Sequence, residues 1–302
     1  MDLKSKIILI YGPTASGKSK FAVKLAKKIN GEIINTDSMQ VYKELKILSA
    51  RPFKKDYQNI KHHLYGFQNV KKKFSTGDWL KLVNQKVKDI KKRKKIPILV
   101  GGTGLYFKAL TQGLINIPNI PNKFREKIRS LYNSIGAKKF YSNLSKIDPL
   151  VKNHISSTDT QRVIRAYEVK LYTKKSMYDW IKDTKSNYKK KDFYKIYIDF
   201  PRDELIKRIN LRVKKMIKKG VINEVKKFIK LKVPKSKSVN KAIGINEVKD
   251  FINKKIQIDE LIERISIKSR QYAKRQNTWG RGNMFDWNKI KPNNLNNFIK
   301  KI

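Results

Sequence analysis

The chain contains no cysteine, only three histidines and no long hydrophobic run among its 302 residues. The absence of cysteine excludes disulfide bonds, thiolate zinc sites and a cysteine nucleophile, so oxygen or nitrogen must hold any metal. His62 and His63 are adjacent and His154 is isolated, which is not a metal-site spacing, and we interpret all three as structural. The N-terminal apolar run, Ile7 to Ile10, is too short for a signal peptide or a membrane span. We therefore expect a cytoplasmic protein with no membrane contact.

Acidic residues are also scarce. Lysine and arginine total 72 against 24 aspartates and glutamates, which gives a formal net charge of +48. Solubility alone requires far less charge, so a polyanionic partner such as nucleic acid is indicated. Abundant lysine, isoleucine and asparagine are also typical of a genome biased toward A and T. Charge alone therefore does not separate function from compositional drift.

Short strands alternate with helices in the first third of the chain. β-branched or apolar runs at residues 6–11, 32–35 and 96–100 predict strands, and the periodicity of residues 18–29 and 78–95 predicts helices. This alternation is typical of a parallel α/β sheet.

The pattern changes after Pro118. Residues 121–190 hold helical patterns and no strand, so we predict a helical insertion domain there. A strand at residues 194–200 then returns to the sheet, and a long final helix is expected from Ile258 to Trp279. Residues 1–120 and 191–302 would together form the catalytic core.

One motif identifies a phosphate site. Its residues are Gly12, Pro13, Thr14, Ala15, Ser16, Gly17, Lys18 and Ser19, which fit the pattern G-x-x-x-x-G-K-[ST]. In this pattern backbone N–H groups wrap a phosphate, the lysine adds charge and the final hydroxyl binds Mg²⁺. A strand precedes the loop and a helix follows it, so the core is predicted to be P-loop NTPase-like. Such a cradle serves ATP, GTP or another diphosphate equally well.

Further motifs follow the loop in a fixed order. They are Asn35 to Lys43 (NTDSMQVYK), Ala50 to Pro52 (ARP), His62 to Leu64 (HHL), Gly101 to Phe107 (GGTGLYF), Asp159 to Ala166 (DTQRVIRA), Arg208 to Glu224, Ala242 to Gly244 (AIG) and Tyr272 to Trp279 (YAKRQNTW). This series resembles the tRNA dimethylallyltransferase family over nearly the whole chain. The sequence departs from the family pattern at Tyr65-Gly66, Ile245 and Gly280, which affects fine contacts to RNA rather than the reaction.

The resemblance implies a reaction and its partners. The enzyme would transfer the dimethylallyl group from dimethylallyl diphosphate to the exocyclic amine of the adenosine 3′ to the anticodon, with Mg²⁺ as cofactor. Its partners would be dimethylallyl diphosphate and the tRNA anticodon stem-loop. Because the chain lacks cysteine, it has no zinc module of the kind that some family members carry, and we expect a compact monomer.

Three residues are catalytic candidates. Asp37 follows the second predicted strand, at the sheet edge where ligands gather, and on residue type alone it could be a general base, a helix cap or a magnesium ligand. The resemblance implies the base. Thr103 could cap a helix or bind substrate, and the resemblance implies contact near the adenine. Arg208 lies four residues after Glu204, which predicts a helical ion pair and leaves Arg212 as the diphosphate ligand.

A base inside a stacked anticodon loop must be flipped out to reach a buried diphosphate, which favours a two-domain clamp. The resemblance implies RNA contacts by Asp37, Ser38, Met39, Gln40, Thr103, Arg125, Gln161, Arg162, Val163, Ile164, Arg165, Lys241 and Arg275. Arg162 and Arg165 are three residues apart and share a helical face. That face would also fit an exposed, salt-bridged surface.

Two other functions share parts of this pattern. A P-loop phosphotransferase acting on a nucleotide or an RNA end would use the same loop, magnesium and aspartate. An RNA-binding NTPase would fit the charge. However, the strand at residues 96–100 ends in Gly101-Gly102, where an NTPase would carry its Walker B acid, which argues against NTP hydrolysis.

Overall fold

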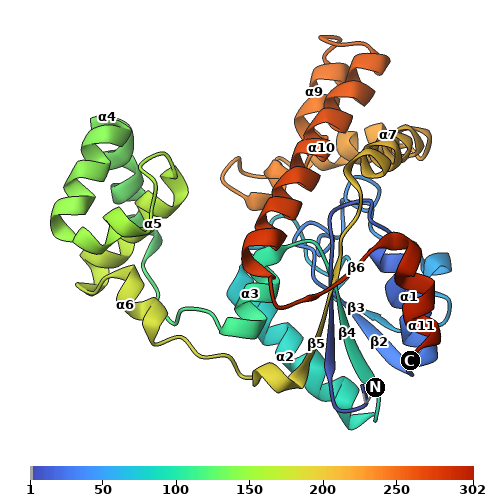
Figure 1. Cartoon of the computed structure of the whole chain (residues 1–302). Helices are drawn as coiled ribbons and strands as arrows, with labels where there is room; N and C mark the ends of the chain where they lie inside the picture. Colours follow the sequence, from blue (N-terminus) through green and yellow to red (C-terminus); the bar gives the residue numbers. More distant parts are fainter. Residues whose placement is uncertain (1–2) are drawn as a thin grey trace. The chain divides into compact units, whose positions relative to one another are not determined.

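A six-stranded parallel sheet organises the chain (Figure 1). The computed structural model describes residues 3–302, and its strand order is β3-β2-β4-β1-β5-β6. The strands are β1 (Ile7–Tyr11), β2 (Gly31–Asn35), β3 (His62–His63), β4 (Ile96–Gly101), β5 (Phe193–Ile198) and β6 (Asn288–Ile290). Every pairing is parallel, which confirms the predicted α/β class. The short edge strands β3 and β6 were not predicted, because two or three residues carry too little periodicity.

Helices cover both faces of the sheet. On one face lie α1 (Lys18–Lys28) and α11 (Leu295–Lys300), and on the other lie α2 (Thr76–Lys92) and α3 (Gly104–Gln112) (Figure 1). The central strands β1 and β4 are therefore buried along their whole length. Burial on both faces explains why these strands read as continuous apolar runs instead of alternating patterns.

Four more helices pack together beyond the carboxyl ends of the strands (Figure 1). They are α7 (Arg202–Lys218), α8 (Val221–Lys230), α9 (Ile245–Ile252) and α10 (Ile258–Asn283). Helix α10 continues four residues past the predicted end at Trp279. This helical layer faces the edge of the sheet that carries the phosphate loop, and so it supplies the other side of any site there.

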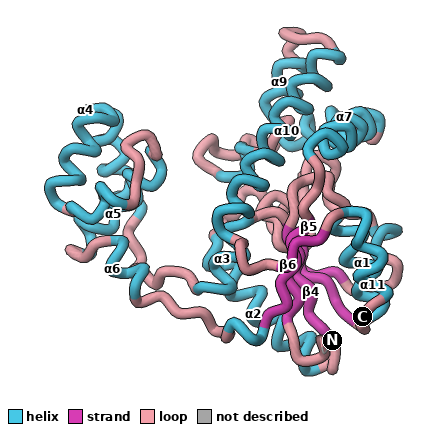
Figure 2. The backbone as a smooth tube through the Cα atoms, viewed as in Figure 1, coloured by secondary structure: helices cyan, strands magenta, loops and turns pink. Residues whose placement is uncertain are grey.

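The chain folds into two compact units. Unit 1 comprises Met1–Ala109 and Tyr188–Ile302, and unit 2 comprises Leu110–Asn187, where the sequence predicted an insertion at 121–190. Unit 2 is built from α4 (Asn122–Ile147), α5 (Thr160–Thr173) and α6 (Met177–Lys182), and its described residues form no strand (Figure 2). Short 3₁₀ helices complete the chain at Lys54–Tyr57, Pro149–Asn153, Lys190–Asp192, Ser238–Lys241 and Pro292–Asn294.

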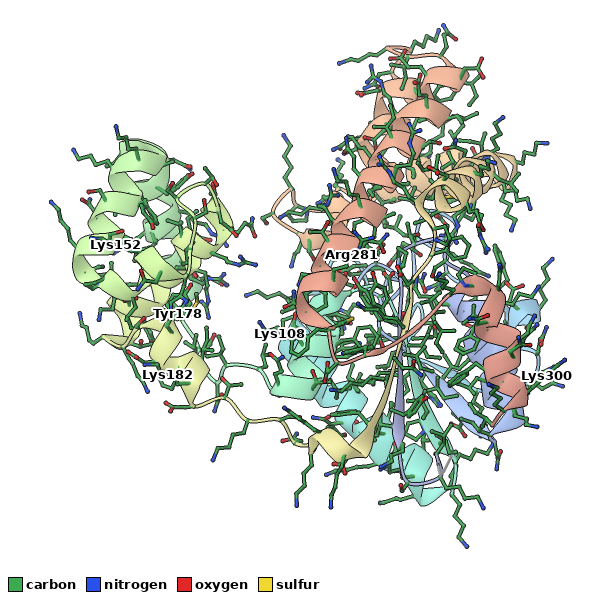
Figure 3. All side chains as sticks on the ribbon, in the orientation of Figure 1. Lys108, Lys152, Tyr178, Lys182, Arg281 and Lys300 are labelled. Atoms are coloured by element: carbon green, nitrogen blue, oxygen red, sulfur yellow. The ribbon has the colours of Figure 1, made fainter. Side chains whose placement is uncertain are left out.

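Basic side chains project from the surface of each unit (Figure 3). Lys152 and Lys182 of unit 2 and Lys300 of unit 1 are examples, and all three are exposed. Within the described part of the chain, no helix is both long and apolar enough to span a bilayer.

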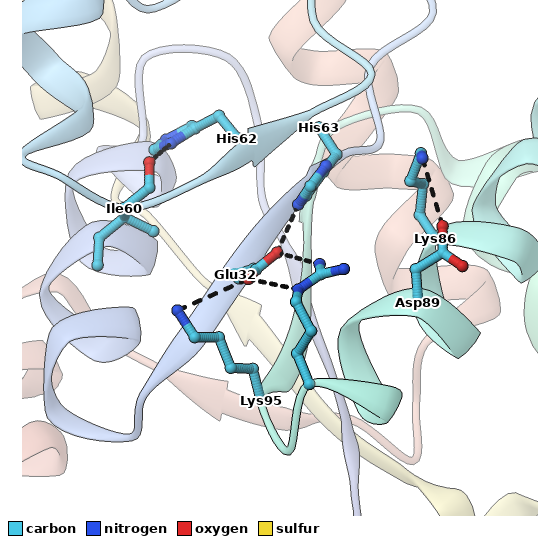
Figure 4. Close-up of polar contacts among 8 residues, drawn as sticks. Glu32, Ile60, His62, His63, Lys86, Asp89 and Lys95 are labelled. Atoms are coloured by element: carbon cyan, nitrogen blue, oxygen red, sulfur yellow. Dashed lines mark hydrogen bonds and ion pairs between the residues drawn. The ribbon is translucent and has the colours of Figure 1, made fainter.

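A buried carboxylate ties β2 to its neighbours (Figure 4). Glu32 is fully buried and lies 2.7 Å from His63 Nε2, 2.7 Å from Arg93 Nη2 and 3.7 Å from Lys95 Nζ. Burial alone raises the pKa of Glu32, but hydrogen bonds from Arg93 and His63 outweigh it and lower the pKa to about 2. His63 therefore has a structural partner, in line with the interpretation from its sequence.

We predict that Glu32→Gln lowers the free energy of unfolding by about 3 kcal/mol near neutral pH, since a depressed carboxyl pKa stabilises the fold. This contribution is complete above the ordinary carboxyl pKa of 4.5 and is lost as the pH falls toward 2. Urea unfolding at a series of pH values should show a constant gap between the variant and the native chain above about pH 5, which narrows below it. The exposed Glu263→Gln is the control, and a gap independent of pH would contradict the assignment.

Candidate active site

The phosphate loop, Gly12 to Ser19, connects β1 to α1. Ala15 has a φ of 66° and Gly17 a φ of 84°, and these left-handed residues turn the chain around the space where a phosphate would lie. The ammonium of Lys18 donates to the carbonyl oxygen of Pro13 at 3.0 Å. Burial lowers the pKa of Lys18 to about 8, so the fold holds a cation at a position where an anion would stabilise it.

Two arginines of α7 reach this loop. Arg212 Nη1 donates to Thr14 Oγ1 at 2.9 Å, and burial together with Arg208 lowers the pKa of Arg212 to about 10. Arg208 Nη2 lies 3.2 Å from where a Cβ on Gly17 would sit, and the guanidinium stands 4.8 Å above the ring of Phe200. The predicted pair of Arg208 with Glu204 is wrong, because the aromatic ring draws the arginine toward the loop. Arg208 is thus a loop cation that sequence reasoning missed.

Asp37 begins the loop that follows β2. Its Oδ1 accepts the backbone N–H groups of Met39 at 2.9 Å and Gln40 at 3.4 Å, so one oxygen caps the next turn. Burial and the charge of Asp37 raise the pKa of the Tyr272 hydroxyl, which places the carboxylate close to α10. The helix-cap alternative therefore accounts for Oδ1, and Oδ2 is available for the role of general base.

Thr103 connects two loops at the sheet edge. Its Oγ1 accepts from the backbone N–H of Ser38 at 3.0 Å and donates to Ser38 Oγ at 3.3 Å. The hydroxyl therefore holds the Asp37 loop against the end of β4. In this arrangement Thr103 orients Asp37 through its neighbour.

Helix α10 fixes the position of the phosphate loop through hydrogen bonds. Gln276 Oε1 accepts from the backbone N–H of Thr14 at 2.7 Å, and its Nε2 donates to the carbonyl oxygen of Gly102 at 2.9 Å. A Cβ on Gly104 would lie 2.2 Å from the ring of Trp279. The GGTG and QNTW motifs are therefore packing partners, a role that their separation in sequence concealed.

Two adjoining cavities share part of their lining near the phosphate loop. One, of 320 Å³, has largely apolar walls, and the other, of 510 Å³, contains the phosphate-loop side chains. Both are lined by Thr14, Asp37, Ser49, Ala50 and Arg212. The apolar walls of the first come from Leu48, Ile209, Val213, Met216, Ala242, Ile243 and Ile265. The structure thus places a polar chamber beside an apolar one, with Asp37 at the junction.

Most predicted site residues of unit 1 converge on these cavities. Ser38, Met39, Lys241 and Arg275 line the apolar cavity, and Lys18, Ser19 and Gln40 line the polar one. They come from α1, the loop after β2, the 3₁₀ helix Ser238–Lys241 and α10, which are far apart in sequence.

The predicted RNA residues of unit 2 divide into two groups. Gln161 and Arg162 are exposed, and Arg162 forms an ion pair with Asp159 at 3.2 Å in the first turn of α5. Val163 is 1% exposed, and Ile164 packs against the same hydrophobic core. Both side chains contribute to packing, and an RNA contact at these two positions stays a prediction.

A buried carboxylate anchors the remaining arginines of unit 2. Glu168 is 1% exposed, and its Oε2 lies 3.1 Å from both Arg125 Nε and Arg165 Nη1. Arg129 approaches Oε1 at 3.9 Å. Arg125 and Arg165 therefore have a structural role, while the group of three guanidiniums around one acid retains a net positive charge.

The oxygen donors near the phosphate loop suit a hard cation. Ser19 and Asp37 line the polar cavity, and the nearby Ser16 Oγ is buried without a protein partner. Among residues 3–302 no group of three His, Cys, Asp or Glu side chains could form a complete metal cage. A cation here would need further oxygens from a phosphorylated ligand and water, which is the usual mode for Mg²⁺.

Comparisons with known proteins agree with this geometry. Residues 40–283 match the model of the IPP transferase family. A tRNA dimethylallyltransferase of Pelagibacter ubique is 59% identical over 302 residues, which cover 100% of this chain and 96% of the relative. One from Rickettsia massiliae is 41% identical over 99% of this chain and 83% of the relative.

Solved structures give the same result. A tRNA isopentenylpyrophosphate transferase of Bacillus halodurans superimposes with a TM-score of 0.70 at 33% identity, covering 98% of this chain and 95% of that one. A eukaryotic dimethylallyltransferase, studied while acting on tRNA, gives a TM-score of 0.82 at 28% identity over 95% of this chain and 74% of that one. Since the family model spans most of the chain and the relatives extend over all of it, this chain belongs to the IPP transferase family.

Proposed function

We propose that this chain transfers the dimethylallyl group of dimethylallyl diphosphate to the exocyclic amine of the adenosine 3′ to the anticodon of tRNA, releasing diphosphate. One observation carries the proposal, namely the apolar cavity that adjoins the phosphate loop. The polar cavity would hold the diphosphate and the apolar cavity the five-carbon group. This division matches an allylic diphosphate better than a nucleoside triphosphate.

The loop cations would stabilise the leaving group. As the amine nitrogen forms its bond to the allylic carbon, the C–O bond breaks and its electron pair moves to the diphosphate oxygen. Lys18, Arg208, Arg212 and the loop N–H groups would balance this developing charge, and they are fixed before the reaction begins. The apolar walls keep water away from the electron-poor carbon.

Asp37 is the proposed base. It stands at the junction of the two cavities, where the amine and the allylic carbon would meet. The N–H groups of Met39 and Gln40 hold Oδ1, so the carboxylate is oriented and Oδ2 is left to accept the amine proton. Thr103 maintains this orientation through Ser38.

Mg²⁺ is the proposed cofactor. When bound, it would neutralise charge on the diphosphate oxygens. Ser19 would be its protein ligand, because its hydroxyl lines the polar cavity beside the phosphate loop.

A P-loop phosphotransferase is the alternative, and the end of β4 argues against it. A Cβ on Gly101 would lie 2.0 Å from the carbonyl oxygen of Thr36, so no acidic side chain fits at this position. A P-loop enzyme that hydrolyses or transfers phosphate carries an acid there to organise the metal. The site therefore supports release of an intact diphosphate.

The tRNA anticodon stem-loop is the proposed acceptor. Lys241 and Arg275 line the apolar cavity of unit 1, where a flipped adenosine would enter. Arg162 and the arginines around Glu168 present positive charge on unit 2, the proposed clamp, and Gln161 adds an exposed amide. Because one chain contains both cavities, we propose that it acts as a monomer. We also propose that it acts in the cytoplasm.

We predict that Asp37→Asn lowers kcat about 10²- to 10⁴-fold, the usual effect of losing a general base. The asparagine oxygen can still accept the N–H groups of Met39 and Gln40, so the turn should remain and the donor KM should change little. The assay combines the protein with Mg²⁺, dimethylallyl diphosphate and unmodified tRNA, and digested RNA is examined by mass spectrometry for prenylated adenosine.

Two results of this assay would contradict the proposal. If Asp37→Asn is as active as the native chain while Asp37→Ala is not, the aspartate is only a cap and the base lies elsewhere. If the native chain forms no prenylated adenosine but consumes ATP when RNA is present, the phosphotransferase alternative replaces prenyl transfer.

We also predict that Arg162→Gln weakens tRNA binding and reduces the slope of log affinity against log salt by about 1, as expected for one lost phosphate contact. The side chain is 68% exposed, so the fold should tolerate the change. Filter binding over a range of salt concentrations measures both quantities. Lys300→Gln, which removes an exposed charge from α11, is the matched control, and equal effects in the two variants would refute a specific contact.

A further inference from the structure

A carboxylate from α8 captures three successive backbone N–H groups of a distant turn. Glu224 Oε2 accepts from the N–H groups of Lys46 and Ile47, each at 2.8 Å, and Oε1 accepts from the N–H of Leu48 at 2.8 Å. These are charge-assisted bonds, which are stronger than neutral ones. The carboxylate thus binds the amino end of the turn, residues 46–50, as an anion binds the first turn of a helix.

This turn forms a wall shared by the two cavities. Leu48 lines the apolar cavity, and Ser49 and Ala50 line both cavities. Leu48 also packs on Gly244, since a Cβ there would lie 2.5 Å from Leu48 Cδ1. The turn therefore separates the proposed diphosphate chamber from the proposed prenyl chamber.

The turn needs an external anchor. Ala50 has a φ of 50°, a left-handed conformation that a residue with a Cβ adopts only at a cost. On the other side Gln40 Nε2 donates to the carbonyl oxygen of Ser49 at 3.1 Å, which joins the turn to the loop of Asp37. Glu224 is therefore the first member of a chain of contacts that ends beside the proposed base.

We infer that Glu224 is a positioning residue for the allylic diphosphate, which it serves by fixing the shared wall of the two cavities without touching the substrate. The inference rests on the proposed function, because it assumes that the cavities hold the donor. It assigns Glu224 to donor recognition and not to RNA recognition, since the turn that it holds contains no proposed RNA contact.

The test is Glu224→Gln, which keeps the shape of the side chain but places an amide N–H₂ against backbone N–H donors. We expect the Kd of dimethylallyl diphosphate, measured by calorimetry in the presence of Mg²⁺, to rise about tenfold, in line with the loss of charge-assisted bonds. The affinity for tRNA should change less than about twofold, because its surface lies on other elements. Glu263→Gln on α10, which removes an exposed acid, should leave both values unchanged.

Leu48→Ala supplies a second measurement that does not depend on the folding of the Glu224 variant. It removes part of the same wall, so it should also weaken donor binding and spare tRNA binding. Because both changes act on one turn, the double variant should lose less donor affinity than the product of the two single effects. Independent, multiplicative losses would contradict a shared wall.

The possible results separate this inference from the proposed function. A native donor affinity in Glu224→Gln, or an equal loss of donor and tRNA binding, overturns the positioning role while the native chain still transfers the prenyl group. If the native chain binds no dimethylallyl diphosphate, both the proposed function and the role of Glu224 fall. Selective loss of donor binding in both single variants supports the inference.

Discussion

The arrangement of the site depends on how closely α10 approaches the carboxyl edge of the sheet. Gln276 joins the phosphate loop at Thr14 to the end of β4 at Gly102, and Trp279 occupies the space that a side chain at residue 104 would need. Gly102 and Gly104 leave room for this contact, because a Cβ on Gly102 would lie 2.1 Å from Gln276 and one on Gly104 would lie 2.2 Å from Trp279. The neighbouring Gly101, where a Cβ would lie 2.0 Å from the carbonyl oxygen of Thr36, leaves no room for the acid that NTP chemistry requires. Close packing at the end of β4 therefore both shapes the cavities and restricts what they can do.

Positive charge predominates at the carboxyl edge of the sheet. Lys18 and Arg212 are partly buried near one another, and burial lowers the pKa of each. Asp37 is the carboxylate that acts on both, and one of its oxygens is committed to a turn. A bound diphosphate would supply the missing negative charge. These cations are therefore placed to bind the donor and to stabilise its leaving group.

Local patterns in the sequence were enough to predict much of this. The phosphate loop with its flanking strand and helix is a contiguous signal, and the apolar runs located the central strands. Predictions failed where a long-range contact decided the outcome. Arg208 turned away from Glu204 because Phe200, which lies before the helix, attracts it. Glu224 and Gln276 carry no signal of their own, since their partners lie about 180 and 260 residues away.

The predicted RNA residues of unit 2 show the same limit of sequence motifs, because a motif does not tell which of its side chains are exposed. The segment from Gln161 to Arg165 matched the family motif as a block, but only one face of this helix reaches solvent. Val163 lies on the other face and is buried in the core of unit 2. The motif located a helix with an exposed basic face, and its contact with RNA stays a prediction. Burial was needed to decide which of its residues meet a ligand.

Several of the few acidic residues have structural roles inside the protein. Glu32, Glu168 and Glu247 are all buried, and each holds basic side chains of its own unit. Glu224 is committed to a backbone turn. The acids at these positions anchor the fold instead of balancing surface charge, which leaves the lysines of the surface largely uncompensated. Compositional drift could supply such lysines, but it does not explain why acids persist at internal anchors. Because several of the few acids are committed to internal contacts, the exterior stays strongly positive and attracts RNA at long range.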